Sequence, residues 1–204
     1  MSLVRTPHSF SRALPSVDPL LGESFAGFVY DVDQRVRAGV SDDVELCEQL
    51  QGPLAHLVAD PAWIPAELVV PAQVGYRREC LYQAPDAAFS IGVFTWKPGH
   101  KSRIHDHHAW AVLGNMTGTL RAEQFLAVNP GRVFKRCEDT LLGAGEVVWS
   151  TPDTGDIHRI SVASEEISIS IHIYGCSFSQ VNREYYIDIA EEATPILRDS
   201  LVSS

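Results

Sequence analysis

From Tyr76 onward, the chain is a succession of short segments rich in Val, Ile, Phe, Tyr and Thr, separated by Gly, Pro and Asp. Such segments are typical of β-strands, and no helical pattern comes between them. This spacing favours a sandwich or a barrel over a parallel sheet with crossover helices. The expected strands are FSIGVFTW, HAWAVLGN, GTLRAEQFLAV, RVFKRCE, EVVWSTP, HRISVAS, ISISIHIYG and REYYIDIA.

The residues before these strands carry helical signals. LLGESFAGFVYDVDQRVRAG has apolar positions at three- and four-residue spacing and closes with Gly39. SDDVELCEQLQGPLAHLVAD follows, with Asp42 and Glu45 placed as a capping box. Three prolines in PAWIPAELVVPA predict a connector. We expect a helical segment over residues 1–75, packed on a barrel over residues 76–204 within one structural domain.

Composition narrows the possible partners and locations. The chain has 204 residues and a formal net charge of -10, without a Lys/Arg cluster, so nucleic acid is not an expected partner. No apolar run approaches the roughly 20 residues that cross a bilayer, and the start lacks the apolar region of a secretory signal. We therefore expect no membrane association, a cytoplasmic location and a frayed N-terminus. The four widely spaced cysteines are expected to be mostly buried free thiols.

The histidines suggest a metal site. In RIHDHHAW, His105 and His107 are separated by one residue, Asp106. An extended strand would therefore place both histidines on one face, with Cα atoms about 6.7 Å apart, and would turn Asp106 to the other face. His158, in TPDTGDIHRIS, is a candidate third ligand, whereas strand parity turns His108 away. Three neutral imidazoles suit zinc, copper, nickel or iron(II) and leave coordination positions open. Taken singly, each histidine could equally be a structural residue.

A second pattern occurs in the segment Ser168–Tyr174, where isoleucines alternate with other residues. One face of this strand carries Ser170, His172 and Tyr174, and the other carries only isoleucine. The polar row faces either solvent or a functional interior. A hydrolase triad is not favoured, because the row lacks an acidic group to orient the histidine and an evident oxyanion hole.

The segment GHKSRIHDHHAWAVLGNMTG follows the first cupin motif, except that Ala111 stands where the motif has a glutamate ligand. Four blocks, YRRECLY, WKPGHKSRIHDH, GDIHR and SISIHIYG, occur in the order seen in the cysteine dioxygenase family, and the chain resembles that family. The resemblance implies an all-β cupin barrel, also called a double-stranded β-helix or jelly-roll, with N-terminal helices.

The resemblance also implies a function. Iron(II) would be held by His105, His107 and His158, and Arg78 would receive the carboxylate of a small thiol. Both atoms of O2 would pass to the sulfur to give a sulfinate, with cysteine the favoured substrate. Dioxygenation of 3-mercaptopropionate, of mercaptosuccinate or of a carbon substrate such as a diketone stays open. So does a non-catalytic cupin that binds a metal and a small molecule.

The resemblance further implies that Ser170, His172 and Tyr174 form a hydrogen-bonded relay beside the metal. In this relay the Tyr174 hydroxyl would bind substrate or oxygen. Ala111 replaces the cysteine that animal enzymes of the family cross-link to the tyrosine, so no thioether is expected here. Trp110 is more similar to the mercaptopropionate-type enzymes, which conflicts with the specificity suggested by Arg78. No oligomeric state is predicted.

Overall fold

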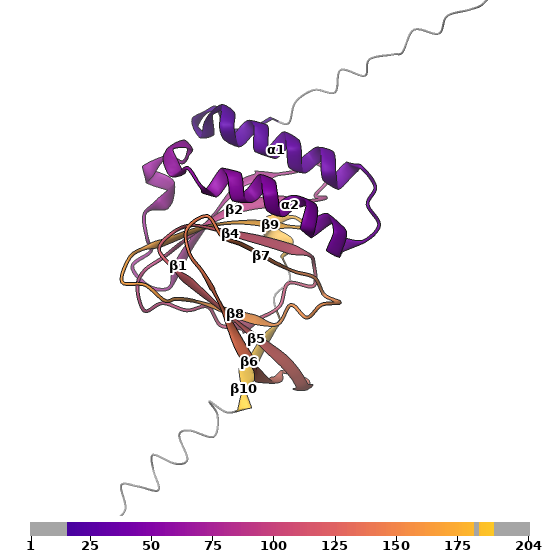
Figure 1. Ribbon diagram of the computed structural model, residues 1–204, viewed down its shortest axis with the longest axis vertical. Coiled ribbons are helices and arrows are strands. Elements are labelled where there is room, and N and C mark those ends of the chain that lie inside the picture. Colours follow the sequence, from indigo (N-terminus) through magenta and orange to yellow (C-terminus); the bar gives the residue numbers. More distant parts are fainter. Residues whose placement is uncertain (1–15, 182–183, 190–204) are drawn as a thin grey trace, which may run out of the picture.

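The computed structural model describes residues 16–181 and 184–189, and the expected frayed N-terminus falls mainly outside them. Two helices, α1 (Gly22–Arg37) and α2 (Asp43–Val58), lie side by side across one face of a sheet, and a second sheet lies beyond it (Figure 1). Short 3-10 turns precede α1 and follow α2. They are η1 (Pro19–Leu21), η2 (Pro61–Trp63) and η3 (Ala66–Val69), and the last two lie in the expected connector.

In the described part of the chain, ten strands build the two sheets. They are β1 (Tyr76–Gln83), β2 (Ser90–Trp96), β3 (Ile104–His105), β4 (Ala111–Thr117), β5 (Leu120–Asn129), β6 (Arg132–Leu142), β7 (Val147–Ser150), β8 (His158–Val162), β9 (Ser168–Tyr174) and β10 (Tyr185–Asp188). The first sheet has the order β1-β2-β9-β4-β7. The second closes on itself as β10-β3-β8-β5-β6, because β10 pairs with both β3 and β6. The predicted all-β barrel with N-terminal helices is confirmed.

The first sheet is buried on both faces and therefore separates two cores. On β9, Ile171 and Ile173 pack into the core beneath the helices, whereas Tyr174 belongs to a separate cluster on the barrel side. Every residue of β2 is buried for the same reason, with Ile91 on the helix side and Phe94 on the barrel side. The alternation seen in the sequence thus directs isoleucines toward the helices and polar groups toward the barrel interior.

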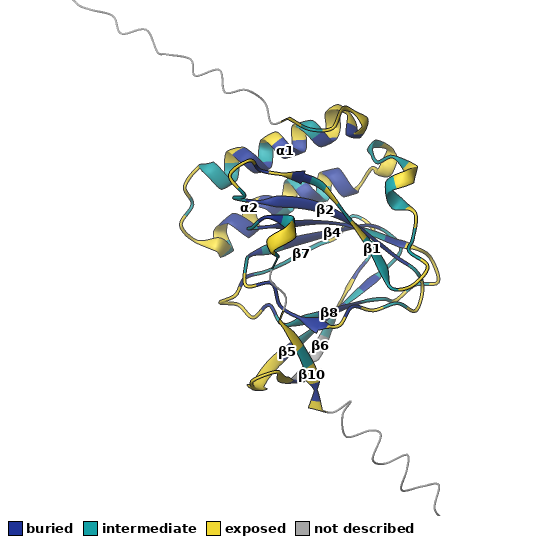
Figure 2. Cartoon of the chain, turned by 180° about the vertical axis from the view of Figure 1, so that it is seen from behind, coloured by how far each residue is buried: buried dark blue, intermediate teal, exposed yellow. Residues whose placement is uncertain are grey.

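The helices cover the sheet with apolar faces that the 3.6-residue period creates. In α1 the apolar residues of the buried face are Phe25, Phe28, Val29 and Val32, and Asp33 is buried beside them. Figure 2 shows the buried side of both helices turned toward the strands. Close packing of α2 on β4 depends on Gly114, because a Cβ there would lie 2.8 Å from Cγ of Leu54. The helices therefore sit against the outer face of the sheet whose inner face lines the barrel.

Several predicted boundaries were wrong. β1 was not among the expected strands, and β10 is shorter than the expected REYYIDIA. The expected strand HAWAVLGN begins only at Ala111, because His108 has a positive φ of 51° that extended backbone does not allow. The strand expected to carry both His105 and His107 ends at His105.

Two smaller expectations also change. Asp42 caps α2 by accepting a hydrogen bond from the Val44 backbone N–H, but Glu45 accepts one from the Gln49 side chain, so the contacts found do not form a capping box. Among the cysteines whose side chains are described, Cys47 is buried, Cys80 is exposed and Cys176 is partly buried. The expectation of mostly buried thiols was therefore wrong for Cys80.

Within the described ranges, the helices are too short or too polar to cross a bilayer.

Candidate metal centre

Three imidazoles meet at one end of the barrel interior. His105 ends β3 and pairs directly with His158, the first residue of β8, while His107 lies in the loop after β3. Their candidate ligand nitrogens all lie within 4.8 Å of one another. His105 and His107 are buried and His158 is partly buried. The structure thus brings together the three histidines that the sequence singled out.

Backbone carbonyls orient two of the three rings. Nδ1 of His105 lies 2.7 Å from the carbonyl oxygen of Arg103, and Nδ1 of His158 contacts the carbonyl oxygen of Asp156. Because a carbonyl only accepts, each Nδ1 carries the proton and each Nε2 keeps its lone pair for a metal ion. Three neutral imidazoles without a carboxylate fit a divalent transition metal that keeps open coordination positions.

Asp156 fixes the loop that carries His107. The buried Asp156 accepts hydrogen bonds at Oδ2 from the backbone N–H groups of His107, at 3.1 Å, and His108, at 3.2 Å. The loop before β8 is thereby tied to the loop after β3, and both carry candidate ligands. The sequence analysis missed Asp156, although an acid two residues before His158 in GDIHR was an available signal.

His108 lies outside the cluster. Its side chain is about half exposed and places Nε2 3.2 Å from Oδ1 of Asp106, in a separate group with Asp106 and Glu184. Asp106 accepts a hydrogen bond from the Tyr186 hydroxyl of β10, and it lies outside β3, so the expected strand alternation does not apply to it. The reason for the His108 orientation differs from the predicted one, since it follows from the positive φ and not from strand parity.

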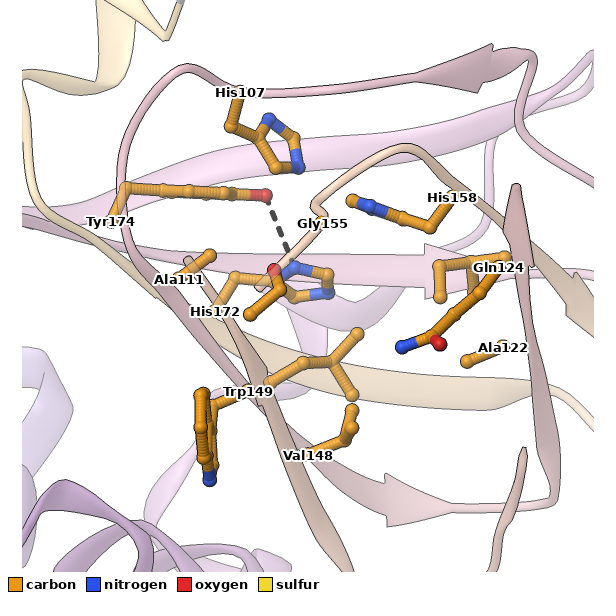
Figure 3. A pocket seen from close by; sticks show the side chains of 13 residues that line it. His107, Ala111, Ala122, Gln124, Val148, Trp149, Gly155, His158, His172 and Tyr174 are labelled. Atoms are coloured by element: carbon orange, nitrogen blue, oxygen red, sulfur yellow. Dashed lines mark hydrogen bonds between the residues drawn. The ribbon is translucent and has the colours of Figure 1, made fainter. Parts of the chain in front are cut away.

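The polar row on β9 is buried and internally hydrogen bonded. Oγ of Ser170 lies 2.9 Å from Nε2 of His172, and the Tyr174 hydroxyl lies 3.1 Å from Nδ1 of the same ring. The ring of Phe94 stacks on His172 with a centroid distance of 4.0 Å. The Tyr174 ring lies 4.9 Å from the ring of His107, so the row reaches the imidazole cluster. Figure 3 shows the Tyr174 hydroxyl pointing between His107 and His172.

Trp96 extends this row and sets its direction. Its indole Nε1–H, which can only donate, lies 3.0 Å from Oγ of the fully buried Ser170. Ser170 accepts this hydrogen bond, and among the described residues Nε2 of His172 is the acceptor found for the buried hydroxyl proton of Ser170 itself. His172 then donates from Nδ1 to the Tyr174 oxygen, so the phenol is the acceptor in this bond. The sequence analysis did not assign Trp96 to the site.

A cavity of about 50 Å³ adjoins the cluster, enough for a few waters or a small molecule. Its walls come from β4, β5, β7, β8 and β9, from the loop after β3 and from the loop before β8 (Figure 3). The lining residues are His107, Ala111, Leu113, Ala122, Gln124, Val148, Trp149, Ser150, Gly155, His158, Ile160, His172 and Tyr174. Of these, the sequence analysis had singled out the histidines, Tyr174 and Ala111, which pairs with Tyr174 across two strands.

Arg78 does not line this cavity. It pairs with Phe94 across β1 and β2, and its exposed guanidinium lies 5.6 Å from the centroid of the Phe178 ring. Phe178 belongs to η4 (Phe178–Gln180) and also contacts Tyr174, with a centroid distance of 6.5 Å. Among the described residues, Arg78 makes no hydrogen bond or ion pair. The residue expected to receive a carboxylate therefore sits outside the cavity, beyond Phe178.

Comparison with known families decides what this arrangement is. The family model of cysteine dioxygenase type I matches residues 68–186, which is more than half of the chain and includes all three clustered histidines. The chain belongs to the cysteine dioxygenase family. The predicted resemblance is thereby confirmed, and membership identifies the protein as a dioxygenase-type oxidoreductase from a family of metalloenzymes.

Solved structures similar to this cysteine dioxygenase family member include several cupins. A conserved protein with a double-stranded β-helix domain from Klebsiella pneumoniae is 17% identical, with 59% of this chain and 86% of that one covered and a TM-score of 0.47. A cupin-like protein from Thermotoga maritima is 19% identical, and the match covers 58% of this chain and 82% of that one with a TM-score of 0.42. A cupin 2 conserved barrel domain protein from Salinispora arenicola is 20% identical, and the match covers 58% of this chain and 90% of that one with a TM-score of 0.42.

Proposed function

We propose that this protein is an iron(II)-dependent thiol dioxygenase. It would insert both atoms of O2 into the sulfur of a small carboxylate-bearing thiol, with cysteine favoured, and release a sulfinate. The observation that carries the proposal is the cluster of His105, His107 and His158, which among the described residues includes no carboxylate ligand, at one end of a small cavity that Tyr174 also lines. Family membership supports dioxygenase chemistry at this cluster.

The three histidines would hold the iron, which when bound would supply open positions for the thiolate and O2. The chain's own residues then position the reactants. Tyr174, held by His172, offers its phenol proton to an oxygen atom of the substrate or of O2. Leu113, Val148 and Ile160 give the cavity apolar walls, and a fixed thiol and oxygen would replace a bimolecular encounter.

Arg78 is proposed as an anchor for the carboxylate, through the paired N–H groups of its guanidinium. In the structure it lies on the same side of β1 as Tyr76, which stacks on Trp96 with a centroid distance of 4.3 Å. Reaching the cavity requires the guanidinium to move inward past Phe178. If Arg78→Ala leaves the apparent affinity for every carboxylate-bearing thiol unchanged, the anchor assignment is wrong.

The thiol substrate is tested with oxygen consumption by the iron(II)-loaded protein. The panel contains cysteine, 3-mercaptopropionate, mercaptosuccinate and a diketone, and product masses are measured. We expect oxygen consumption with at least one thiol and a product that has gained two oxygen atoms. His158→Ala should show neither oxygen consumption nor this product. Iron-loaded protein that consumes no oxygen with any thiol would instead be a non-catalytic metal-dependent cupin.

A further inference from the structure

A second group of possible metal ligands shares the loop that carries His107. It consists of Asp106 and His108 from that loop and of Glu184, which directly precedes β10. One ligand atom from each of these three residues lies within 4.8 Å of the other two. We propose that the three residues bind a divalent transition-metal ion of their own, separate from the three-histidine cluster. This second site does not depend on the proposed dioxygenase activity.

The spacing of the ligand atoms suits a single ion. Nε2 of His108 lies 3.2 Å from Oδ1 of Asp106 and 3.7 Å from Oε2 of Glu184. Two ligand atoms that bind one zinc ion at about 2.0–2.2 Å lie about 3.0–3.5 Å apart. The imidazole therefore already has nearly the required distance to both carboxylates. The Glu184 side chain is 66% exposed, so a small rotation can close the remaining gap.

Hydrogen bonds hold the buried carboxylate of the group in place. Oδ2 of Asp106 accepts from the Tyr186 hydroxyl, and Oδ1 accepts from the backbone N–H of Glu184 at 3.2 Å. The Tyr186 hydroxyl also lies 3.0 Å from Oε2 of Glu184, so it contacts both carboxylates. A carboxylate offers about four lone-pair sites, so Asp106 can bind an ion and keep both hydrogen bonds. Contacts of this kind behind a ligand set its orientation.

The donors define the class of ion. Among the described residues, no lysine or arginine pairs with Asp106 or Glu184, and His108 is the basic side chain that contacts both. Two carboxylates and one neutral imidazole leave a local negative charge that a divalent cation would neutralise. The imidazole favours a transition metal such as zinc over calcium or magnesium, which prefer oxygen ligands. His108 and Glu184 are exposed, so water can complete the coordination.

An ion at the second site would connect two segments that lie far apart in the sequence. Asp106 and His108 belong to the loop between β3 and β4, whereas Glu184 leads into β10. In the loop, Asp106 is flanked by His105 and His107 of the three-histidine cluster. The ion would therefore add a metal cross-link beside that cluster, where hydrogen bonds to Asp106 already join the loop to β10.

The test counts the zinc ions that bind to the chelator-treated full chain, by calorimetry, so that it does not depend on turnover. We expect two ions per chain in wild type and one in His158→Ala, which lacks a ligand of the three-histidine cluster. His108→Gly should lose the other ion, and the double variant should bind none. Glycine is chosen because it readily adopts the φ of 51° found at His108.

A second variant tests the carboxylate. Glu184→Gln keeps the size of the side chain but removes its charge, and the exposed position makes a loss of folding unexpected. We expect the affinity of the second site for zinc to fall by about 10-fold or more, since replacing even the outer partners of a metal ligand has an effect of this size. The affinity of the three-histidine cluster should stay the same.

His56→Ala, at an exposed position of α2, is the control and should bind as many zinc ions as wild type. The second site is ruled out if His108→Gly and Glu184→Gln bind zinc in the same number and with the same affinity as wild type. If His158→Ala alone loses an ion, the three-histidine cluster stands without a second site. If His56→Ala loses an ion as His108→Gly does, exposed histidines bind zinc unspecifically, and the second site is again ruled out.

Discussion

The phenol of Tyr186 donates a hydrogen bond of 2.7 Å to Oδ2 of Asp106, the residue that lies between His105 and His107. Oδ1 of Asp106 accepts a second hydrogen bond, of 3.2 Å, from the backbone N–H of Glu184. On the same strand, Tyr185 pairs with His105. The C-terminal strand β10 therefore braces the loop between two candidate metal ligands from outside the barrel. Such contacts behind a ligand set its orientation.

Replacing Tyr186 with Phe should weaken metal binding. Burial, followed by the hydrogen bonds to Asp106 and Glu184, raises the pKa of the Tyr186 phenol, so it stays a donor throughout the neutral range. Loss of this donor removes the hydrogen bond to Oδ2 of Asp106 and loosens the loop, although Oδ1 keeps its contacts with Glu184 and His108. We expect the iron(II) affinity, measured by competition with a chelator, to fall about 10-fold. Tyr30→Phe, on the exposed face of α1, should leave it unchanged. Equal affinities for Tyr186→Phe and wild type would show that β10 does not restrain the ligands.

Replacing Asp156 with Ala should destabilise the fold even without metal. The change removes the acceptor for the backbone N–H groups of His107 and His108, and the first of these is buried. We expect the free energy of unfolding in urea to fall by about 1–3 kcal/mol. Asp153→Ala, at an exposed position in the same loop, should change it by no more than about 0.5 kcal/mol. Equal effects of the two variants would count against the proposed tie between the loops.

The sequence revealed those parts of the site that depend on local periodicity. A strand repeats its faces every two residues, so the alternation in β9 placed Ser170, His172 and Tyr174 together without knowledge of any other strand. The pair His105 and His107 was found in the same way, although only His105 lies in a strand. The positive φ at His108 could not be foreseen, because nothing in the local pattern excludes a longer strand.

The rest of the site depends on contacts between distant segments. Gln124 reaches the cavity because β5 pairs with β8, and Asp106 meets Tyr186 because β10 pairs with β3. A single sequence does not give such registers.

The strand β1 was missed for another reason. It lies at the edge of the first sheet and carries Arg77, Arg78 and Glu79, so its letters resemble a polar loop. Charged residues are usual on edge strands.

Removing the indole donor of Trp96 should affect the phenol without affecting the metal. In Trp96→Phe, Ser170 loses the donor that fixes the direction of its hydroxyl, so His172 and Tyr174 are no longer held in one hydrogen-bonding order. We expect kcat for thiol oxidation to fall about 5-fold, because a fall of this size corresponds to the free energy of one net hydrogen bond. The pH profile of kcat should shift, and the iron content should stay unchanged. Tyr174→Phe should give the larger fall. A Trp96→Phe enzyme with wild-type kcat and pH profile would rule out the indole as part of the row.

The packing of α2 on the first sheet can be tested with two glycines. Gly114→Ala places a methyl group 2.8 Å from Cγ of Leu54 and 3.0 Å from a methyl group of Val58, so these side chains or the helix that carries them must shift. We expect the free energy of unfolding in urea to fall by about 1–3 kcal/mol. Gly27→Ala, in α1, meets open space and should raise it by about 0.5–1 kcal/mol, because alanine is favoured within a helix. If Gly114→Ala raised stability as well, the contact between α2 and β4 would be looser than the structure shows, and Gly114 would not be required there.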